Sequence, residues 1–109
     1  MLVTAKRQGE TLFIYADGEI DEHSAPAARR VADSVIENNL SAKRVVFDLE
    51  KVSFMDSSGI GFLLGRFKLC NRFGVAAYIK NPNAAADKIL EMSGVYALLP
   101  KLGGERRTV

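Results

Sequence analysis

Hydrophobic and polar positions change period several times along this chain, and each change marks the start or end of an expected element. Short alternating or continuous apolar runs predict strands, because neighbouring side chains of a strand point to opposite faces. Such runs occupy residues 2–6, 11–16, 45–47, 75–79 and 95–99. Gln8 and Gly9 predict a turn between the first two strands, and Asp17 with Gly18 is expected to end the second.

A first helix is predicted at residues 24–38, where the apolar period changes from two to about 3.6. Ser24 is expected to cap this helix, and Pro26 is tolerated in its first turn. Its inward-facing stripe should consist of Ala28, Val31, Ala32 and Val35.

Two further helices follow the third and fourth strands. The second is predicted at residues 58–73, with Gly74 in the position just past its end. The third is expected to open at Asn81 and Pro82 and to stop near Gly94.

The expected order is therefore β-β-α-β-α-β-α-β, within one domain that spans residues 1–109. Repeated strand-helix-strand units predict an α/β fold with a mixed sheet, mostly parallel after the opening hairpin, and helices packed against it through right-handed crossovers. A composition of 48% hydrophobic and 26% charged residues is typical of such a globular domain.

Composition also argues against several classes of partner. The net charge of +2 is too small to indicate nucleic-acid binding, and no apolar run approaches the roughly 20 residues that span a bilayer. Basic residues concentrate only in the tail, at Lys101, Arg106 and Arg107, opposed by Glu105. Cys70 is the single cysteine, which excludes an internal disulfide and favours a cytoplasmic location.

Residues 53–68 carry the clearest chemical signal, because a loop after a buried strand enters a helix there. A helix N-terminus presents unpaired N–H groups and the positive end of the helix dipole, which suit a phosphate. Ser58, or Ser57 beside it, is therefore a reasonable phosphate acceptor. Plain helix capping by Asp56 or Ser57 is the simpler interpretation of the same residues, and the two roles can coexist.

Helical spacing divides this second helix into two faces. The face expected to pack on the sheet consists of Ile60, Leu63, Leu64 and Phe67. The opposite face, expected to be at least partly exposed, consists of Ser58, Phe62, Gly65 and Leu69.

Three glycines in this helix, Gly59, Gly61 and Gly65, need an explanation, because a helical glycine costs about 0.8–1 kcal/mol relative to alanine. Close approach of a partner protein would compensate that cost, and so would tight packing inside the domain.

With these residues in view, the run from Ser53 to Lys68 resembles the signature of the anti-sigma factor antagonists, which adopt the STAS fold. The resemblance is nearest to the sporulation type. Residues 18–21, Gly-Glu-Ile-Asp, and residues 91–94, Glu-Met-Ser-Gly, extend it over most of the chain. One departure is the tail from residue 101 onward, whose paired glycines and basic residues do not predict the final helix usual in the family.

The resemblance implies a phosphorylation-switched binding protein that is not itself an enzyme and needs no cofactor. Ser58 would be phosphorylated by the anti-sigma factor, a GHKL-type serine kinase that brings ATP, and dephosphorylated by a PP2C-type phosphatase. The unphosphorylated form would bind the anti-sigma factor and release the sigma factor. The expected partner-binding residues are Asp21, Asp56, Ser57, Gly59, Gly61, Phe62, Gly65 and Leu69.

Other functions have weaker support. A hydrolase could be imagined from Asp21, His23 and Ser58, but the serine lacks the Gly-x-Ser-x-Gly elbow. A phosphoaspartate receiver would place Lys80 after a strand, yet no acidic pair ends the first strands. Neither a metal-ligand set nor a phosphate-binding P-loop is recognisable. Within the STAS fold, the alternative is a scaffold or regulatory subunit outside sigma control, in a stressosome-like or transporter-associated assembly.

Overall fold

The computed structural model describes residues 1–103. Five strands form one sheet, and their order across the sheet is their order along the chain. β1 (Leu2–Gln8) and β2 (Thr11–Ile20) form an antiparallel hairpin. β3 (Arg44–Met55), β4 (Ala76–Lys80) and β5 (Lys101–Leu102) then join β2 in parallel.

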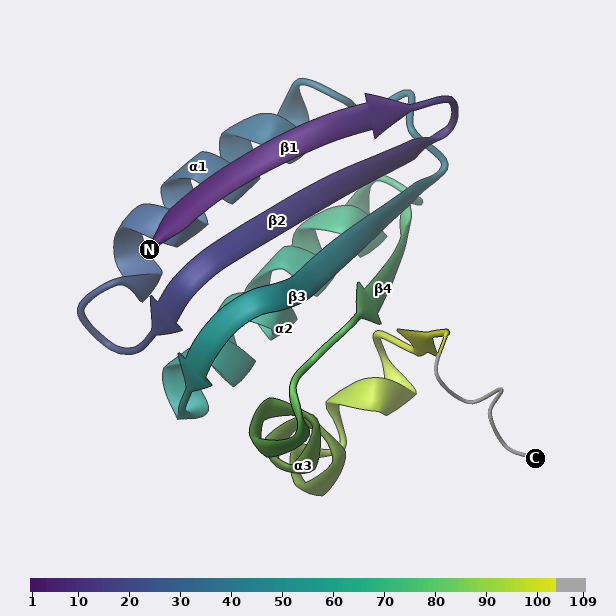
Figure 1. Ribbon diagram of the computed structural model, residues 1–109. Helices are drawn as coiled ribbons and strands as arrows, with labels where there is room; N and C mark the ends of the chain where they lie inside the picture. The colour runs from purple at the N-terminus through teal and green to yellow at the C-terminus, as the bar shows by residue number, and fades with distance from the viewer. Residues whose placement is uncertain (104–109) are drawn as a thin grey trace.

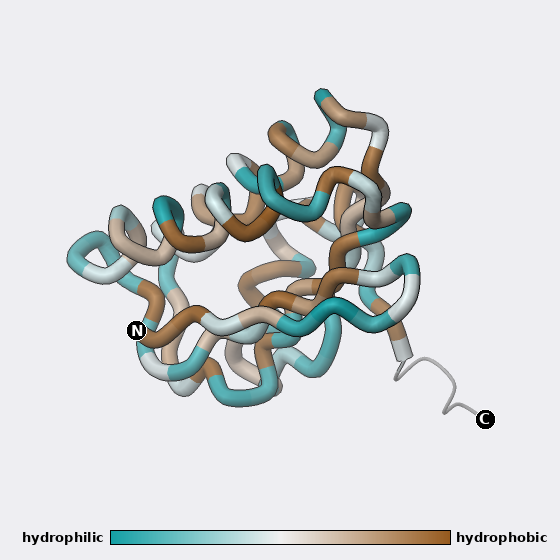
Figure 2. The backbone as a smooth tube through the Cα atoms, turned by 90° about the horizontal axis from the view of Figure 1, so that it is seen from above, coloured by the Kyte–Doolittle hydropathy of each residue, from teal (hydrophilic) through white to brown (hydrophobic). Residues whose placement is uncertain are grey.

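Two long helices lie side by side on one face of this sheet, as Figure 1 shows. They are α1 (Ala25–Glu37) and α2 (Ser57–Arg72). A shorter helix, α3 (Ala84–Ser93), and a single 3-10 turn at Val95–Ala97 follow β4. Hydrophobic residues gather where the helices meet the sheet (Figure 2). The predicted mixed sheet and element order are confirmed.

The strands that lead to the site are longer than expected. β2 does not end at Asp17 and Gly18 but continues to Ile20, through irregularities in its pairing with β3. Gly18 adopts φ +112°, a conformation that side chains disfavour, so the strand can pass through the irregularity there. β3 likewise continues to Met55, beyond the apolar run at 45–47, because its later residues still pair with β2.

The predicted strand at residues 95–99 is wrong. Gly94 ends α3 in the left-handed region (φ +80°), and the chain then makes short-range hydrogen bonds that form the 3-10 turn. The fifth strand lies instead at residues 101–102. The part of the predicted basic tail at residues 104–109 lies outside the described residues.

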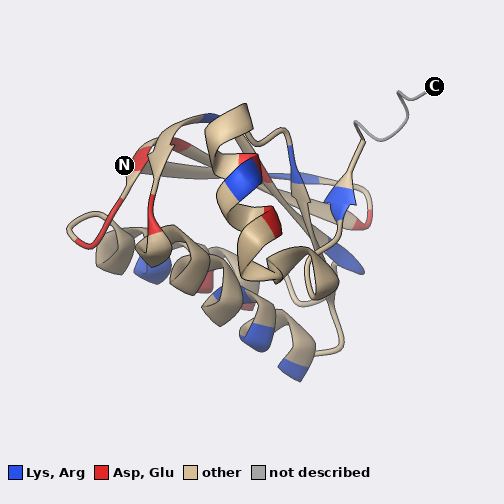
Figure 3. Ribbon diagram, turned by 90° about the horizontal axis from the view of Figure 1, so that it is seen from below, with Lys and Arg blue, Asp and Glu red and all other residues tan. Residues whose placement is uncertain are grey.

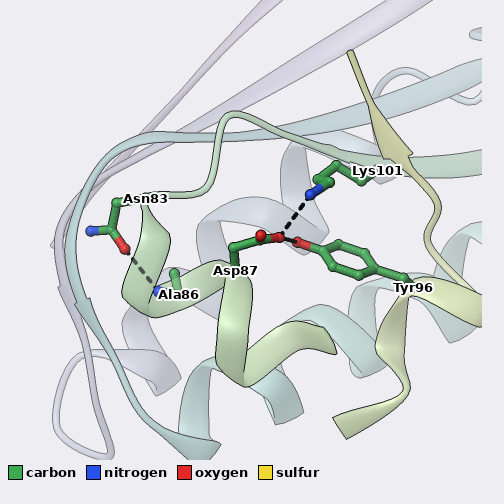
Figure 4. A network of polar contacts seen from close by, with 5 residues as sticks. All are labelled: Asn83, Ala86, Asp87, Tyr96 and Lys101. Atoms are coloured by element: carbon green, nitrogen blue, oxygen red, sulfur yellow. Dashed lines mark hydrogen bonds and ion pairs between the residues drawn. The ribbon is translucent and has the colours of Figure 1, made fainter. Parts of the chain in front are cut away.

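Side-chain bonds join these last elements (Figure 4). Tyr96 donates a hydrogen bond from its hydroxyl to Asp87 Oδ1 at 2.5 Å, and Lys101 Nζ lies 2.9 Å from the same oxygen. Lys101 Nζ also lies 5.3 Å from the centre of the Tyr96 ring. These three residues, the Asp87 network, fix the 3-10 turn and β5 to α3.

Helix boundaries follow the sequence closely, but two caps differ. Ser24 occupies the N-cap position of α1 without a side-chain cap bond. α3 is capped by Asn83, whose Oδ1 accepts from the Ala86 N–H at 2.8 Å, and not by Asn81. Gly74 has φ +71° just past the end of α2, as expected.

The buried stripe of α1 is also displaced from the expected one. It consists of Ala25, Ala28, Ala32 and Ile36. Val31 is 43% exposed, because the small alanines, rather than the valines, let α1 lie close to the sheet.

Candidate partner-binding site

Two loops meet at one edge of the sheet because β2 and β3 run parallel. Ile20, the last residue of β2, pairs with Met55, the last residue of β3. The Asp56 N–H donates to the Ile20 carbonyl oxygen at 3.4 Å. The predicted residues Asp21 and Asp56 therefore follow directly on neighbouring strands, although they are distant in sequence.

Asp56 is the N-cap of α2, which decides between the two candidate capping residues. Its Oδ1 accepts from the Ser58 N–H at 2.8 Å, and its carbonyl oxygen accepts from the Gly59 N–H at 2.9 Å. Ser57 is exposed and Ser58 is partly exposed. The Ser58 N–H is thus already bonded to a carboxylate. The start of the helix would therefore stabilise a phosphate on Ser58 less than the sequence suggested.

Asp21 organises the loop between β2 and α1. Its Oδ1 accepts from the N–H groups of His23 and Ser24, both at 2.9 Å. The bond from Ser24 is the main reason that the pKa of the Asp21 carboxyl lies below its usual value. Ser24 Oγ in turn donates to the Glu19 carbonyl oxygen at 2.7 Å. Both hydrogen bonds that the Asp21 carboxylate accepts therefore come from its own loop.

The imagined hydrolytic triad is not assembled. Asp21 and His23 line one shallow hollow together, whereas Ser58 lines a different one, between α1 and α2. The Asp21 oxygen that would orient the imidazole accepts backbone N–H groups instead. Nothing in this arrangement supports nucleophilic catalysis.

A groove of about 550 Å³ runs between α1 and α2 and begins at Ser58. On the α2 side it is lined by Ser58, Gly61 and Gly65, with Phe62 and Arg66 beneath them. On the α1 side it is lined by Glu22, Ala25, Pro26 and Arg29. We call this the α1–α2 groove.

Two residues expected on the exposed face of α2 are buried. Phe62 is 3% and Leu69 is 7% exposed, and the Phe62 ring packs edge-on against Phe47, with ring centres 6.3 Å apart. The helical-wheel prediction assumed that α2 packs on the sheet alone. Because α2 also packs against α1, its buried face is turned toward that helix.

The three glycines of α2 separate into two kinds. A methyl group on Gly59 would come within 2.5 Å of Met55 Cγ, so Gly59 is required by packing inside the domain. A methyl group on Gly61 or Gly65 would meet no atom within 4 Å. These two glycines leave open space along the groove, which is the geometry that a closely approaching partner needs.

Arg66 is a functional candidate that the sequence reasoning missed. It is 6% exposed, and its Nε lies 2.6 Å from Asp33 Oδ1 of α1. Its Nη1 donates to the Phe62 carbonyl oxygen at 3.0 Å, and its guanidinium lies 5.4 Å from the Phe62 ring centre. Burial lowers the pKa of Arg66, and Asp33 opposes that shift.

The Arg66 ion pair fixes α1 to α2 at the floor of the groove. A sequence signal did exist: an arginine four residues after Phe62, on the apolar face, with an acid on the preceding helix.

Within residues 1–103, no three His, Cys, Asp or Glu side chains gather as a metal site would require. In the same part of the chain, no helix combines the length and apolar character needed to cross a membrane.

A family model for the STAS domain matches residues 3–105. The chain belongs to the STAS domain family. This STAS domain is 34% identical over 89 residues to the anti-sigma F factor antagonist of Paenibacillus polymyxa. The match covers 82% of this chain and 75% of that relative. This domain is also 27% identical over 93 residues to the anti-sigma-B factor antagonist of Bacillus subtilis. That match covers 85% of this chain and 83% of the relative.

The STAS domain also matches the solved structure of the anti-sigma factor antagonist SpoIIAA in its unphosphorylated form. The TM-score is 0.76 at 26% identity, over 95% of this chain and 90% of the other. The fold and family expected from the sequence are therefore confirmed, and the chain is related to anti-sigma factor antagonists.

Proposed function

We propose that this STAS domain is an anti-sigma factor antagonist that binds its anti-sigma factor along the α1–α2 groove while Ser58 is unmodified. The observation that carries the proposal is the position of Ser58. Its partly exposed side chain stands at the start of a groove whose α2 side is formed by the uncovered glycines Gly61 and Gly65. Asp21, Asp56 and Ser57 lie at the same edge of the sheet and would border the contact.

The names of the relatives suggest an anti-sigma factor as the partner, and the proposal adds two enzymes that would modify Ser58. The anti-sigma factor would be a GHKL-type serine kinase that supplies ATP and phosphorylates Ser58, and a PP2C-type phosphatase would reverse the step. Binding of the unphosphorylated chain would release a sigma factor. The sporulation pathway is one candidate, given the relationship to an anti-sigma F factor antagonist.

Phosphorylation would act on the partner contact and leave the fold unchanged. It adds about −1.5 to −2 charges at pH 7. A partner lying on Gly61 and Gly65 would have to desolvate that charge, and an unpaired buried charge costs on the order of 3–5 kcal/mol. Phe62 and Leu69 are buried within this domain, so they would support the surface from beneath and not touch the partner.

The test is intact-mass measurement after incubation with the candidate anti-sigma kinase and ATP. Wild type should gain one phosphate, Ser57→Ala should behave likewise, and Ser58→Ala should gain none. Ser57→Ala is the matched control because it removes the neighbouring hydroxyl of the same helix turn. Ser58→Asp should bind the kinase at least 100-fold more weakly than wild type, in line with the cost of a buried unpaired charge.

The possible outcomes separate the alternatives. Phosphate on Ser58→Ala but not on Ser57→Ala would move the acceptor to Ser57. No phosphate on any form, from a kinase that modifies its own known antagonist, would favour a scaffold role outside sigma control. Tight binding by Ser58→Asp would contradict the switch itself.

A further inference from the structure

The solvent-facing side of α2 carries positive charge without any acid on the same helix. Ser58, Gly61, Gly65, Lys68 and Arg72 are spaced so that they lie along one side of the helix. From Ser58 to Arg72 this stripe is about 21 Å long, at 1.5 Å per residue. Figure 3 shows basic positions along α2 and no acidic one.

On the α1 side, two arginines are balanced by two acids, so the net positive charge comes from Lys68 and Arg72 of α2. Arg29 lines the groove and Arg30 follows it, while Glu22 and Glu37 are the acids near the two ends of α1. Asp33 is already paired with Arg66. Among the described residues, Arg29, Arg30, Lys68 and Arg72 form no ion pair, and Asp56 is the acid at the Ser58 end of the stripe.

Resting on the function proposed above, we propose that the α1–α2 groove takes an acidic segment of the anti-sigma factor. Lys68, Arg72 and Arg29 would be the residues of this chain that recognise the segment. Gly61 and Gly65 leave room for its backbone to approach closely. The cations beyond them would meet its carboxylates, because complementary charge around an interface speeds association and excludes partners of the wrong sign.

This arrangement also gives the phosphate a second effect. A phosphate on Ser58 adds about −1.5 to −2 charges at one end of the positive stripe, so at low salt the electrostatic attraction for an acidic segment weakens. The effect acts across solvent and is therefore sensitive to salt, unlike the desolvation cost at the contact.

The experiment compares two double variants of equal charge change in binding to the anti-sigma kinase. Lys68→Glu with Arg72→Glu reverses the stripe. Lys6→Glu with Lys51→Glu reverses two exposed lysines on β1 and β3, and Lys51 lines a hollow with Leu2, Thr4 and Tyr15 to which α2 does not contribute. Lys68→Gln with Arg72→Gln serves as a milder pair, and urea unfolding checks that all variants are folded.

At low salt the stripe reversal should weaken binding by about 10-fold or more, chiefly through slower association, and the control by less than about 2-fold. The affinity of the Lys68→Gln, Arg72→Gln variant should lie between those of the stripe reversal and the control. The differences should shrink toward about 1 M salt, where the screening length is about 3 Å. Ser58 should still be phosphorylated in every variant at saturating kinase.

Two results would overturn the inference. If the stripe reversal binds as tightly as the control, the partner segment is not acidic, although the proposed switch survives. If the stripe reversal tightens binding, the partner segment is basic. Failure of wild type to bind the kinase or to be phosphorylated would instead remove the proposed function, and this inference with it.

Discussion

At the scale of single residues, the glycines of α2 show how one residue type serves two purposes. Gly59 makes room for Met55, and Gly61 keeps the surface of the α1–α2 groove open. Both lie in a helix, where glycine is costly relative to alanine. The two alanine substitutions are therefore expected to move stability in opposite directions.

Gly59→Ala should lower the free energy of unfolding by about 1–3 kcal/mol, because the new methyl group overlaps the Met55 side chain. Gly61→Ala and Gly65→Ala should raise it by about 0.5–1 kcal/mol, because the added methyl meets open space and alanine favours the helix. Urea unfolding followed by circular dichroism measures all three changes.

The same variants separate stability from binding. Gly61→Ala and Gly65→Ala should weaken binding of the anti-sigma kinase while stabilising the domain, because the methyl groups fill the groove. Unchanged affinity in both would place the partner elsewhere on the surface.

The residue-level predictions from sequence succeeded where the signal was local. A cap at the start of α2 and Gly74 at its end follow from bonds within a few residues, and both are confirmed. The exposure of Phe62 was wrong because it depends on α1, which contacts α2 only after the chain has folded. Arg66 was missed for the same reason, since Asp33 lies on the other helix.

At the scale of elements, the Asp87 network determines how the chain continues after α3. The sequence could indicate that α3 ends near Gly94, but the turn and β5 are held by Asp87, Tyr96 and Lys101 together. Taken alone, the apolar residues at 95–99 resemble a strand. They are apolar because Val95 and Leu99 pack into the core, and not because the segment pairs in the sheet.

The network predicts an acid-dependent loss of stability. The hydrogen bond from Tyr96, followed by that from Lys101, lowers the pKa of the Asp87 carboxyl. A carboxyl with a lowered pKa in the folded state stabilises it above its unfolded pKa of about 3.9, and the contribution disappears as pH falls through the folded value.

Asp87→Asn should therefore be less stable than wild type by on the order of 1 kcal/mol between pH 5 and 8, and the two curves should approach each other as pH falls below about 3.9. Urea unfolding at each pH measures the difference. Lys88→Gln, on the same helix but outside the network, is the control. A difference that does not shrink at all as the solution is acidified from pH 5 would show that the network acts through packing and not through the carboxylate.

At the scale of the whole molecule, the parallel pairing of β2 with β3 is what assembles the site. It brings the loop of Asp21 beside the start of α2 and sets α1 and α2 side by side on one face. The repeated strand-helix-strand pattern predicted a mostly parallel sheet with helices packed on it, but not which strands pair or which face the helices share. The groove itself could not be predicted, because it depends on which side of each helix turns toward the other.

Cys70 offers a reporter of opening of the whole domain. It is fully buried, and burial raises the pKa of its thiol to about 11. The thiolate is the form that attacks a disulfide reagent, so the folded protein should react with such a reagent about 1,000-fold or more slowly than the protein in urea. Absorbance of the thiol released from the reagent, followed by stopped-flow or manual mixing, measures the labelling rates of the folded and unfolded protein.

The control places a cysteine at the surface. Ser57→Cys in a Cys70→Ala background should react at nearly the rate of an unfolded chain, because Ser57 is exposed. Rapid labelling of Cys70 in the folded wild type would mean that α2 detaches locally from the core.

The carboxylate of Asp56 at the start of α2 also bears on the energetics of the proposed switch. Because this anion already occupies the Ser58 N–H, a phosphate ester on Ser58 is held beside like charge, and its hydrolysis releases that repulsion. A phosphoserine ester nonetheless hydrolyses extremely slowly in water without a catalyst, so the modified state proposed above would last until a phosphatase removes the phosphate. The duration of the signal would then be set by the balance between kinase and phosphatase, because the domain does not remove its own phosphate group.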